Sequence, residues 1–271
     1  MNPAIHCHEI TKAFRNKGSG NGKGLFRRRR NKKPLTAVDA LDLSVDRGEI
    51  FGIVGPNGSG KSTLVRLIST LLLPDSGRIE VFGLDVTKEK LKVRRMINRV
   101  SVDAAFFKKL SCWENLSYAA RLYGVPIKDA KERAIKILGR FGFAEDRMYQ
   151  PMEHLSRGMQ QMVAIARAYF TSPVLLLLDE PTTGLDPKSK RQVQEFVLQV
   201  REKHDSTVLL TTHDMDEADK VCDRVAIIDR GRFVALDTPE GLKRMVAREG
   251  QTATLEDVFM ELTGRDWEEG E

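Results

Sequence analysis

The sequence predicts an α/β fold organised around a mostly parallel sheet, and three observations lead to that class. From residue 156 onward, short apolar segments alternate with amphipathic helical segments, the rhythm of strands joined by crossover helices. The run from Val174 to Leu178 is apolar without alternation, as expected for a strand covered on both faces. Between residues 55 and 63, a glycine-rich loop joins an apolar strand to a helix. With 271 residues, 41% of them hydrophobic, the chain is long enough to form one large core.

The N-terminal part is predicted to form strands around one helix. That helix is expected over residues 61–73, where Leu64, Leu67 and Leu71 share one face before Pro74 ends the pattern. Strands are predicted at residues 4–14 (as an edge strand), 37–45, 49–54 and 78–82.

From about Lys88 to His154 the pattern changes to helices, which indicates a helical insertion within the α/β domain. Ser111, followed three residues later by Glu114, forms a capping box that fixes the start of one helix. The helices predicted in this block lie at residues 88–97, 111–124 and 128–142. After it, helices at 156–170, 188–203, 214–222, 240–250 and 254–264 are predicted, with strands at 174–179, 207–212, 224–229 and 233–237.

Composition favours a cytoplasmic protein. The longest aliphatic run, Val174 to Leu178, is far shorter than the ~20 residues of a transmembrane helix. The N-terminus lacks the charged and then apolar pattern of a secretory signal. The three cysteines, Cys7, Cys112 and Cys222, are far apart and suggest neither a disulfide framework nor a zinc site.

The net charge of +6 comes from one segment. Without it the chain is neutral, so a basic surface for nucleic acid is not expected. Two interpretations of the segment stay open: a solvated insertion over about residues 16–34, or contact with anionic lipid headgroups. The charges that would make this contact, between Arg27 and Lys33, are Arg27, Arg28, Arg29, Arg30, Lys32 and Lys33.

The segment GPNGSGKST, residues 55–63, has the spacing of a phosphate-binding loop. It lies between a predicted strand and a predicted helix, where backbone N–H groups and the positive end of the helix face an anion. We expect Lys61 at the β- and γ-phosphates of a purine nucleoside triphosphate, and the Ser62 hydroxyl at Mg²⁺. The expected nucleotide-binding residues of the loop are Gly55, Pro56, Asn57, Gly58, Ser59, Gly60, Lys61, Ser62 and Thr63.

Asp179 and Glu180 follow the apolar strand at its carboxyl end, where open α/β sheets bind ligands. Asp179 is expected to help hold Mg²⁺, and Glu180 to accept a proton from an attacking water, which favours hydrolysis over transfer to a second substrate. His213 ends the strand at 207–212 on the same edge of the sheet. It is expected to contact the γ-phosphate or the water, and a structural histidine is the alternative.

LSRGMQQ, residues 155–161, starts another helix, with Ser156 as its N-cap. One interpretation is a well-capped core helix. The other is a second anion site, because a capped helix start with a glycine exposes N–H donors and a positive dipole end. The chain already uses one helix start for phosphates, at Lys61, so a second such site suggests the nucleotide of another subunit.

Together, these motifs resemble the nucleotide-binding subunit of ATP-binding cassette (ABC) transporters over about residues 4–237. Residues Leu155, Ser156, Arg157, Gly158 and Met159 are similar to the family's signature, usually LSGGQ, and TGLD, ending at Asp186, resembles the loop that crosses to the partner. A finer resemblance is to the exporter branch that includes daunorubicin-resistance ATPases. It is carried by residues 101–124, by LSRGMQQ and by TLEDVFMELTG.

The resemblance implies a P-loop NTPase with a RecA-like core, an N-terminal antiparallel β-subdomain and a helical ABC-specific subdomain at about residues 88–158. Residues 238–271 would form a C-terminal helical extension. Two copies, as a homodimer or heterodimer, would pack head to tail with each ATP between the phosphate loop of one and the signature of the other. A separate integral-membrane permease, for drug, lipid or polysaccharide export, would place the chain on the cytoplasmic face of the cell membrane.

The chain lacks one glutamine of the family pattern, and it offers two candidates for the family's adenine-stacking aromatic residue. No glutamine occurs between Arg99 and Leu110, where the family has a glutamine that touches Mg²⁺, and Asp103 is the nearest polar candidate. Phe14 fits the position of the aromatic residue that stacks on adenine. Phe26 is its competitor, and an ordinary strand phenylalanine is the alternative.

The sequence argues against two rival functions. Cassette proteins that act on ribosomes carry two cassettes in one chain, and those that act in DNA repair contain coiled coils or zinc motifs, features that this sequence lacks. A nucleotide-binding protein without turnover is disfavoured by Glu180 and His213 together.

Overall fold

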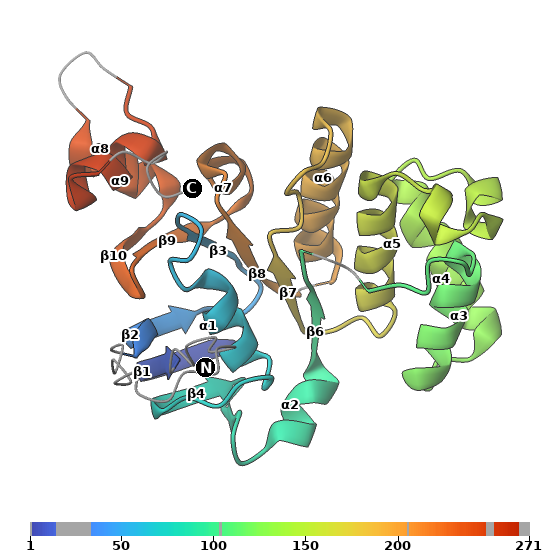
Figure 1. The fold of residues 1–271 in the computed structure, drawn as a ribbon, viewed down its shortest axis with the longest axis horizontal. Coiled ribbons are helices and arrows are strands. Elements are labelled where there is room, and N and C mark those ends of the chain that lie inside the picture. Colours follow the sequence, from blue (N-terminus) through green and yellow to red (C-terminus); the bar gives the residue numbers. More distant parts are fainter. Residues whose placement is uncertain (1, 15–33, 103–104, 205, 248–251, 266–271) are drawn as a thin grey trace, which may run out of the picture.

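The computed structural model describes residues 2–14, 34–102, 105–204, 206–247 and 252–265. Within these residues the strands form an antiparallel sheet and a larger, mostly parallel sheet (Figure 1). The charged segment between Arg27 and Lys33 lies outside the described residues, as do Phe26 and Asp103. The expectations for these residues therefore remain predictions.

The antiparallel sheet has the strand order β2-β1-β4-β5. Its first strand, β1 (Ile5–Phe14), pairs with β2 (Leu35–Val45) on one side and with β4 (Ser76–Val81) on the other, and β5 (Leu84–Asp85) pairs with β4. The prediction of an edge strand at residues 4–14 is therefore wrong, because later segments of the chain cover both of its edges.

The larger sheet has the strand order β10-β9-β3-β8-β7-β6. Every neighbouring pair is parallel except β9 and β10, which confirms the mostly parallel sheet. Strand β6 was not predicted: it follows helix α2 directly, and the helical pattern of residues 88–97 hides its start. The strands are β3 (Ile50–Val54), β6 (Ile97–Val100), β7 (Leu175–Asp179), β8 (Thr207–Thr212), β9 (Arg224–Asp229) and β10 (Arg232–Asp237).

Most predicted helices form, but the first is shorter than expected. Helix α1 ends at Ile68, because Thr70 adopts a left-handed backbone (φ 61°), and Leu71 is 54% exposed. No helix among the described residues has both the length and the apolar character needed to cross a bilayer. The helices are α1 (Lys61–Ile68), α2 (Lys90–Met96), α3 (Cys112–Leu122), α4 (Ile127–Arg140), α5 (Arg157–Tyr169), α6 (Pro187–His204), α7 (Met215–Val221), α8 (Pro239–Val246) and α9 (Leu255–Thr263), with short 3-10 turns at Glu145–Tyr149 and Met152–His154.

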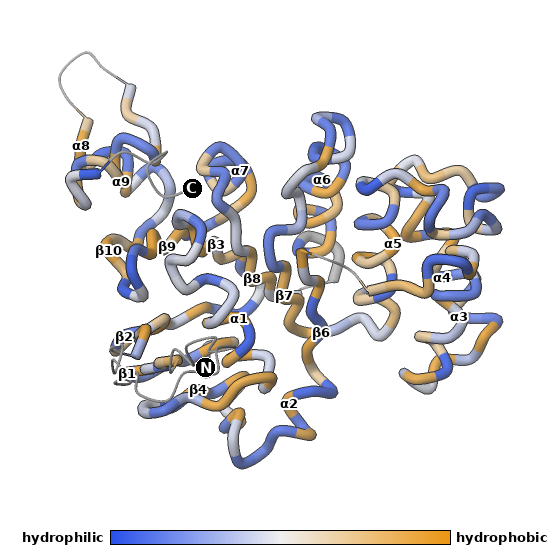
Figure 2. The backbone as a smooth tube through the Cα atoms, viewed as in Figure 1, coloured by the Kyte–Doolittle hydropathy of each residue, from blue (hydrophilic) through white to orange (hydrophobic). Residues whose placement is uncertain are grey.

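Two hydrophobic cores cover the two faces of the larger sheet. Leu175 and Leu177 pack with α1 and the antiparallel sheet, whereas Leu176 and Leu178 pack with α5, α6 and α7. Strand β7 is thus covered on both faces, as its uninterrupted apolar sequence predicted. Figure 2 shows hydrophobic residues concentrated along the strands in the middle of the molecule. This packing fixes the strand ends that carry the site.

Helix α3 begins with the predicted capping box. The Glu114 backbone N–H donates to Ser111 Oγ at 3.2 Å, and the Ser111 N–H donates to Glu114 Oε2 at 2.7 Å. Both interactions satisfy groups at the first turn of the helix that have no partner within the helix.

Replacing Ser111 with alanine should lower the free energy of unfolding by about 1 kcal/mol, because the first turn loses its side-chain acceptor. Chemical denaturation measures this change. Ser117→Ala is the matched control, because Ser117 Oγ donates only to the Glu114 carbonyl within the helix. Equal losses for the two variants would show that the cap does not stabilise α3.

Candidate active site

The phosphate loop connects β3 to α1 at the carboxyl edge of the larger sheet. Gly60 is required there, because its φ is 115° and an added Cβ would lie 2.2 Å from the carbonyl oxygen of Ala37. As the N-cap of α1, Gly60 offers no side-chain acceptor to the N–H groups of the first turn. These donors and the positive helix end suit phosphate oxygens.

Lys61 is buried at the start of α1, with 3% of its side chain exposed. Its ammonium group donates to the carbonyl oxygens of Gly55 (2.5 Å) and Pro56 (3.1 Å) and lies 3.4 Å from Glu180 Oε1. Burial lowers the pKa of Lys61, and the Glu180 carboxylate partly offsets this effect. The buried cation therefore lies directly beneath the loop that would hold phosphates.

Asp179 joins the phosphate loop to the centre of the sheet. Its Oδ1 accepts hydrogen bonds from Ser62 Oγ and Thr211 Oγ1, both at 2.9 Å. Thr211 is opposite Asp179 in the β7–β8 register, so the sheet itself positions this contact. A hydroxyl and a carboxylate this close are the hard oxygen donors that Mg²⁺ prefers, and the pair fits such an ion.

Glu180 follows Asp179 with a left-handed backbone, φ 50°, which is uncommon for a residue other than glycine. Its backbone N–H donates to the carbonyl oxygen of Thr211 at 3.0 Å, which holds this conformation. The carboxylate accepts from Thr183 Oγ1 at 3.0 Å and contacts His213 Nδ1 at 3.2 Å. The turn therefore directs the carboxylate of Glu180 towards both Lys61 and His213.

Another buried carboxyl group lies on helix α7, which follows His213 in the chain. Glu217, on α7, is 1% exposed and accepts hydrogen bonds from Thr182 Oγ1 (2.8 Å) and Gln194 Nε2 (3.4 Å). Burial raises the pKa of Glu217. The Thr182 contact connects the segment after Glu180 to the helix after His213.

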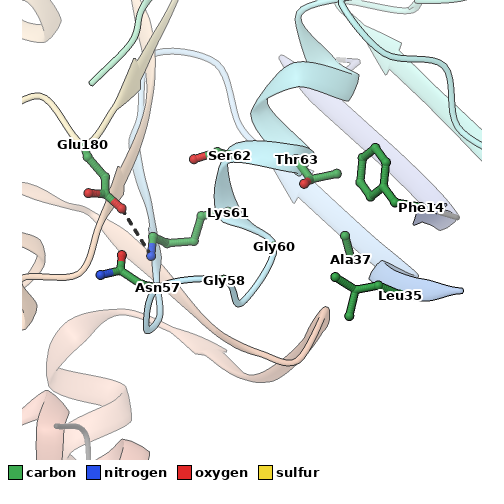
Figure 3. A pocket seen from close by; sticks show the side chains of 10 residues that line it. All are labelled: Phe14, Leu35, Ala37, Asn57, Gly58, Gly60, Lys61, Ser62, Thr63 and Glu180. Atoms are coloured by element: carbon green, nitrogen blue, oxygen red, sulfur yellow. Dashed lines mark ion pairs between the residues drawn. The ribbon is translucent and has the colours of Figure 1, made fainter. Parts of the chain in front are cut away.

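A cavity of about 270 Å³ opens beside these groups. Figure 3 shows Lys61, Asn57 and Glu180 at one end and Phe14 and Leu35 at the other. Phe14 is 38% exposed at the end of β1, so its ring is available to a ligand in the cavity. The lining residues are Phe14, Leu35, Ala37, Asn57, Gly58, Gly60, Lys61, Ser62, Thr63 and Glu180.

The signature segment lies elsewhere. Ser156 caps α5, with the Met159 N–H donating to Ser156 Oγ at 3.2 Å, so the predicted N-cap is confirmed. Helix α5 lies on the opposite side of α6 from α1 in Figure 1. Within the described part of the chain, none of Leu155, Ser156, Arg157, Gly158 and Met159 lines the cavity.

Asp186 packs beside the signature. It caps α6, accepting hydrogen bonds at 3.1 Å from the N–H groups of Lys188 and Ser189, and Ser189 Oγ donates to it at 2.6 Å. An added Cβ on Gly158 would come within 2.4 Å of Ser189 Oγ, so only glycine fits this packing. The hydrogen bonds of Ser189 lower the pKa of Asp186. Signature and TGLD loop thus lie side by side, with Ser156, Arg157, Gly184 and Asp186 exposed.

A family model described as "ABC transporter" matches residues 38–183, more than half of the chain. The chain belongs to the ABC transporter family. Its P-loop NTPase fold agrees with that of a solved ATP-binding subunit of an ABC transporter. That structure is 27% identical, has a TM-score of 0.77, and is matched over 96% of this chain and 99% of that chain.

Relatives confirm the resemblance to the daunorubicin-resistance branch. The daunorubicin/doxorubicin resistance ATP-binding protein DrrA of Streptomyces peucetius is 46% identical over 76% of this chain, which spans 62% of that protein's length. NatA, an ABC transporter ATP-binding protein of Bacillus subtilis, is 37% identical over 78% of this chain and 85% of its own length. A dimeric, post-hydrolysis ATP-binding cassette bound to ADP and Pi is 25% identical, with a TM-score of 0.74 and coverage of 86% and 98% of the two chains.

Three contributors to the site escaped the sequence analysis. Thr211 was part of a predicted strand, and only its register with β7 shows that it holds Asp179. Arg99 lies in the strand that was not predicted, 3.8 Å from Asp179. Glu217 was placed on a helix, and nothing in its spacing indicated burial.

The raised pKa of Glu217 predicts a pH effect on stability. Above the ordinary glutamate pKa of 4.5, the folded state binds more protons at this site than the unfolded state, so this group's contribution to stability falls as pH rises. Glu217→Gln, which stays neutral, should therefore gain stability relative to the wild type between about pH 4.5 and 7. Thermal unfolding across this range measures the difference, and a constant difference would contradict the raised pKa.

Proposed function

We propose that this chain hydrolyses MgATP as part of a dimer that encloses two nucleotides. Each nucleotide would lie between the phosphate loop of one chain and the signature of the other. The proposal rests on one observation: the sequence motifs of the chain lie in two separate places. Lys61, Asp179, Glu180 and His213 meet beside one cavity, whereas Ser156 begins a second anion-suited helix outside it.

Each residue has a physical role in this reaction. The loop amides and Lys61 bind the phosphates, and Phe14 stacks on adenine at the apolar end of the cavity. Bound Mg²⁺, held by Ser62 and Asp179, would neutralise charge on the phosphates. Glu180 accepts a proton from the attacking water, while His213 and Thr183 keep its carboxylate directed at the site.

The signature and TGLD loop complete the partner's site in this proposal. Ser156 directs the N-terminus of α5 at the partner's phosphates, and Asp186 supports Gly158 from behind through Ser189. The solved dimeric cassette bound to ADP and Pi supports this arrangement by its similarity. The partner is a second copy or a related cassette.

The dimer is proposed to drive a separate integral-membrane permease from the cytoplasmic face of the cell membrane. The names of the similar DrrA proteins support an exporter of drug type, with lipid and polysaccharide cargo as related possibilities. The proposed nucleotide-binding domain spans residues 4–237, with its helical subdomain at about 88–158 and the extension at 238–271. Contact of Arg27–Lys33 with anionic lipid belongs to the same proposal.

Glu180→Gln should bind ATP, dimerise in MgATP and lose turnover roughly 10²- to 10⁴-fold, because the amide cannot accept the proton from water. Analytical ultracentrifugation with and without MgATP, together with phosphate release, measures both effects. Glu195→Gln is the matched control, since Glu195 is exposed on α6. A Glu180→Gln chain that binds MgATP but remains monomeric, alone and in membranes with its permease, would contradict the proposal.

A further inference from the structure

Arg99 lies on strand β6, with its guanidinium group 3.8 Å from Asp179. Ile97, two residues earlier, packs in the core on the α1 face of the sheet, and Val100 packs in the other core. Because side chains alternate along a strand, Arg99 shares the α1 face with Ile97. Asp179 shares that face with Leu177, and β6 and β7 are neighbours in the sheet. Arg99 and Asp179 therefore converge below the start of α1.

The guanidinium group of Arg99 has an unused donor at this point. Its Nη1 is buried without a hydrogen-bond partner, and it lies 3.8 Å from Asp179 Oδ2, too far for a hydrogen bond. The other Asp179 oxygen already accepts from Ser62 and Thr211. Buried donors in native proteins almost always have a hydrogen-bond acceptor, so a charged donor that has only a long ion pair with Asp179, beside the metal-suited pair, calls for an anionic acceptor.

The charge of the site agrees with such an acceptor. Arg99 and Lys61 together balance Asp179 and Glu180. A bound nucleoside triphosphate with its Mg²⁺ brings net negative charge, and its terminal phosphate is the part nearest to Ser62 and Asp179 in the proposed mode of binding. Planar guanidinium groups match phosphate oxygens in geometry as well as in charge.

We propose that Arg99 binds the terminal phosphate of ATP within its own chain and so makes the site prefer ATP over ADP. The inference rests on the proposed function, since it takes the cavity as the nucleotide site. Arg99 then acts opposite Lys61: the lysine holds the phosphate chain from the loop, and the arginine holds its terminal group from the sheet. ADP, which ends one phosphate earlier, does not use this contact.

Calorimetric titration of the full chain with MgATP and with MgADP tests the proposal. Both titrations use the Glu180→Gln background, so that ATP is not consumed. Arg99→Gln should weaken ATP binding roughly ten- to hundredfold, the effect of a lost hydrogen bond to a charged group, and ADP binding by less than about threefold. Arg95→Gln is the matched control, because Arg95 is exposed on α2.

Arg99→Lys keeps the positive charge but loses the planar pair of donors. It provides the test if Arg99→Gln fails to fold. It should weaken ATP binding by a few-fold, roughly three to ten, and leave ADP binding unchanged. Equal losses for ATP and ADP, or no loss for either, would overturn the role of Arg99. A Glu180→Gln parent chain that binds neither nucleotide would instead overturn the proposed function, and this inference with it.

Discussion

Three parallel strands, β3, β7 and β8, end at the same edge of the larger sheet, and this shared edge brings the site together. Strand β3 delivers the phosphate loop, β7 delivers Asp179 and Glu180, and β8 delivers His213. Their order, with β8 between β3 and β7, places Thr211 directly beside Asp179. Burial of β7 on both faces fixes this edge, so the positions of the proposed catalytic groups follow from the packing of the sheet.

The short segment after β7 connects Glu180 and its contacts to the surface that we propose binds the partner chain. Glu180 contacts Lys61 and His213, Thr182 bonds to Glu217 on α7, and Asp186 supports the signature through Ser189. Gly184 packs against Arg157, so the signature and this segment fit closely together. Seven consecutive residues, 180–186, therefore connect Glu180 to the signature of the same chain. In the proposed dimer, this connection would link the state of one nucleotide to the binding of the other.

Much of this architecture could be predicted from the sequence because its signals are local. The glycine spacing of residues 55–60, the apolar run before Asp179, and the caps at Ser111 and Ser156 each depend on neighbours within a few residues. Features set by distant partners could not be predicted. Strand β1 lies inside its sheet because of residues far along the chain, and α1 stops early at the left-handed Thr70. Likewise, Arg99 comes close to Asp179 only because β6 pairs with β7.

Each chain is proposed to supply half of each reaction centre, and the mixing of two inactive variants tests this division. Lys61→Ala disables the phosphate loop. Ser156→Asp keeps an effective N-cap on α5 but sets a negative charge against the partner's phosphates, and Ser156→Asn is its neutral control.

Each of these two variants alone should be inactive. Their equal mixture should recover up to about a quarter of wild-type ATP turnover, because about half of randomly formed dimers are mixed and each of these has one intact centre of two. A mixture as inactive as its components, although ultracentrifugation shows that mixed dimers form, would mean that the reaction centre is not divided between two chains.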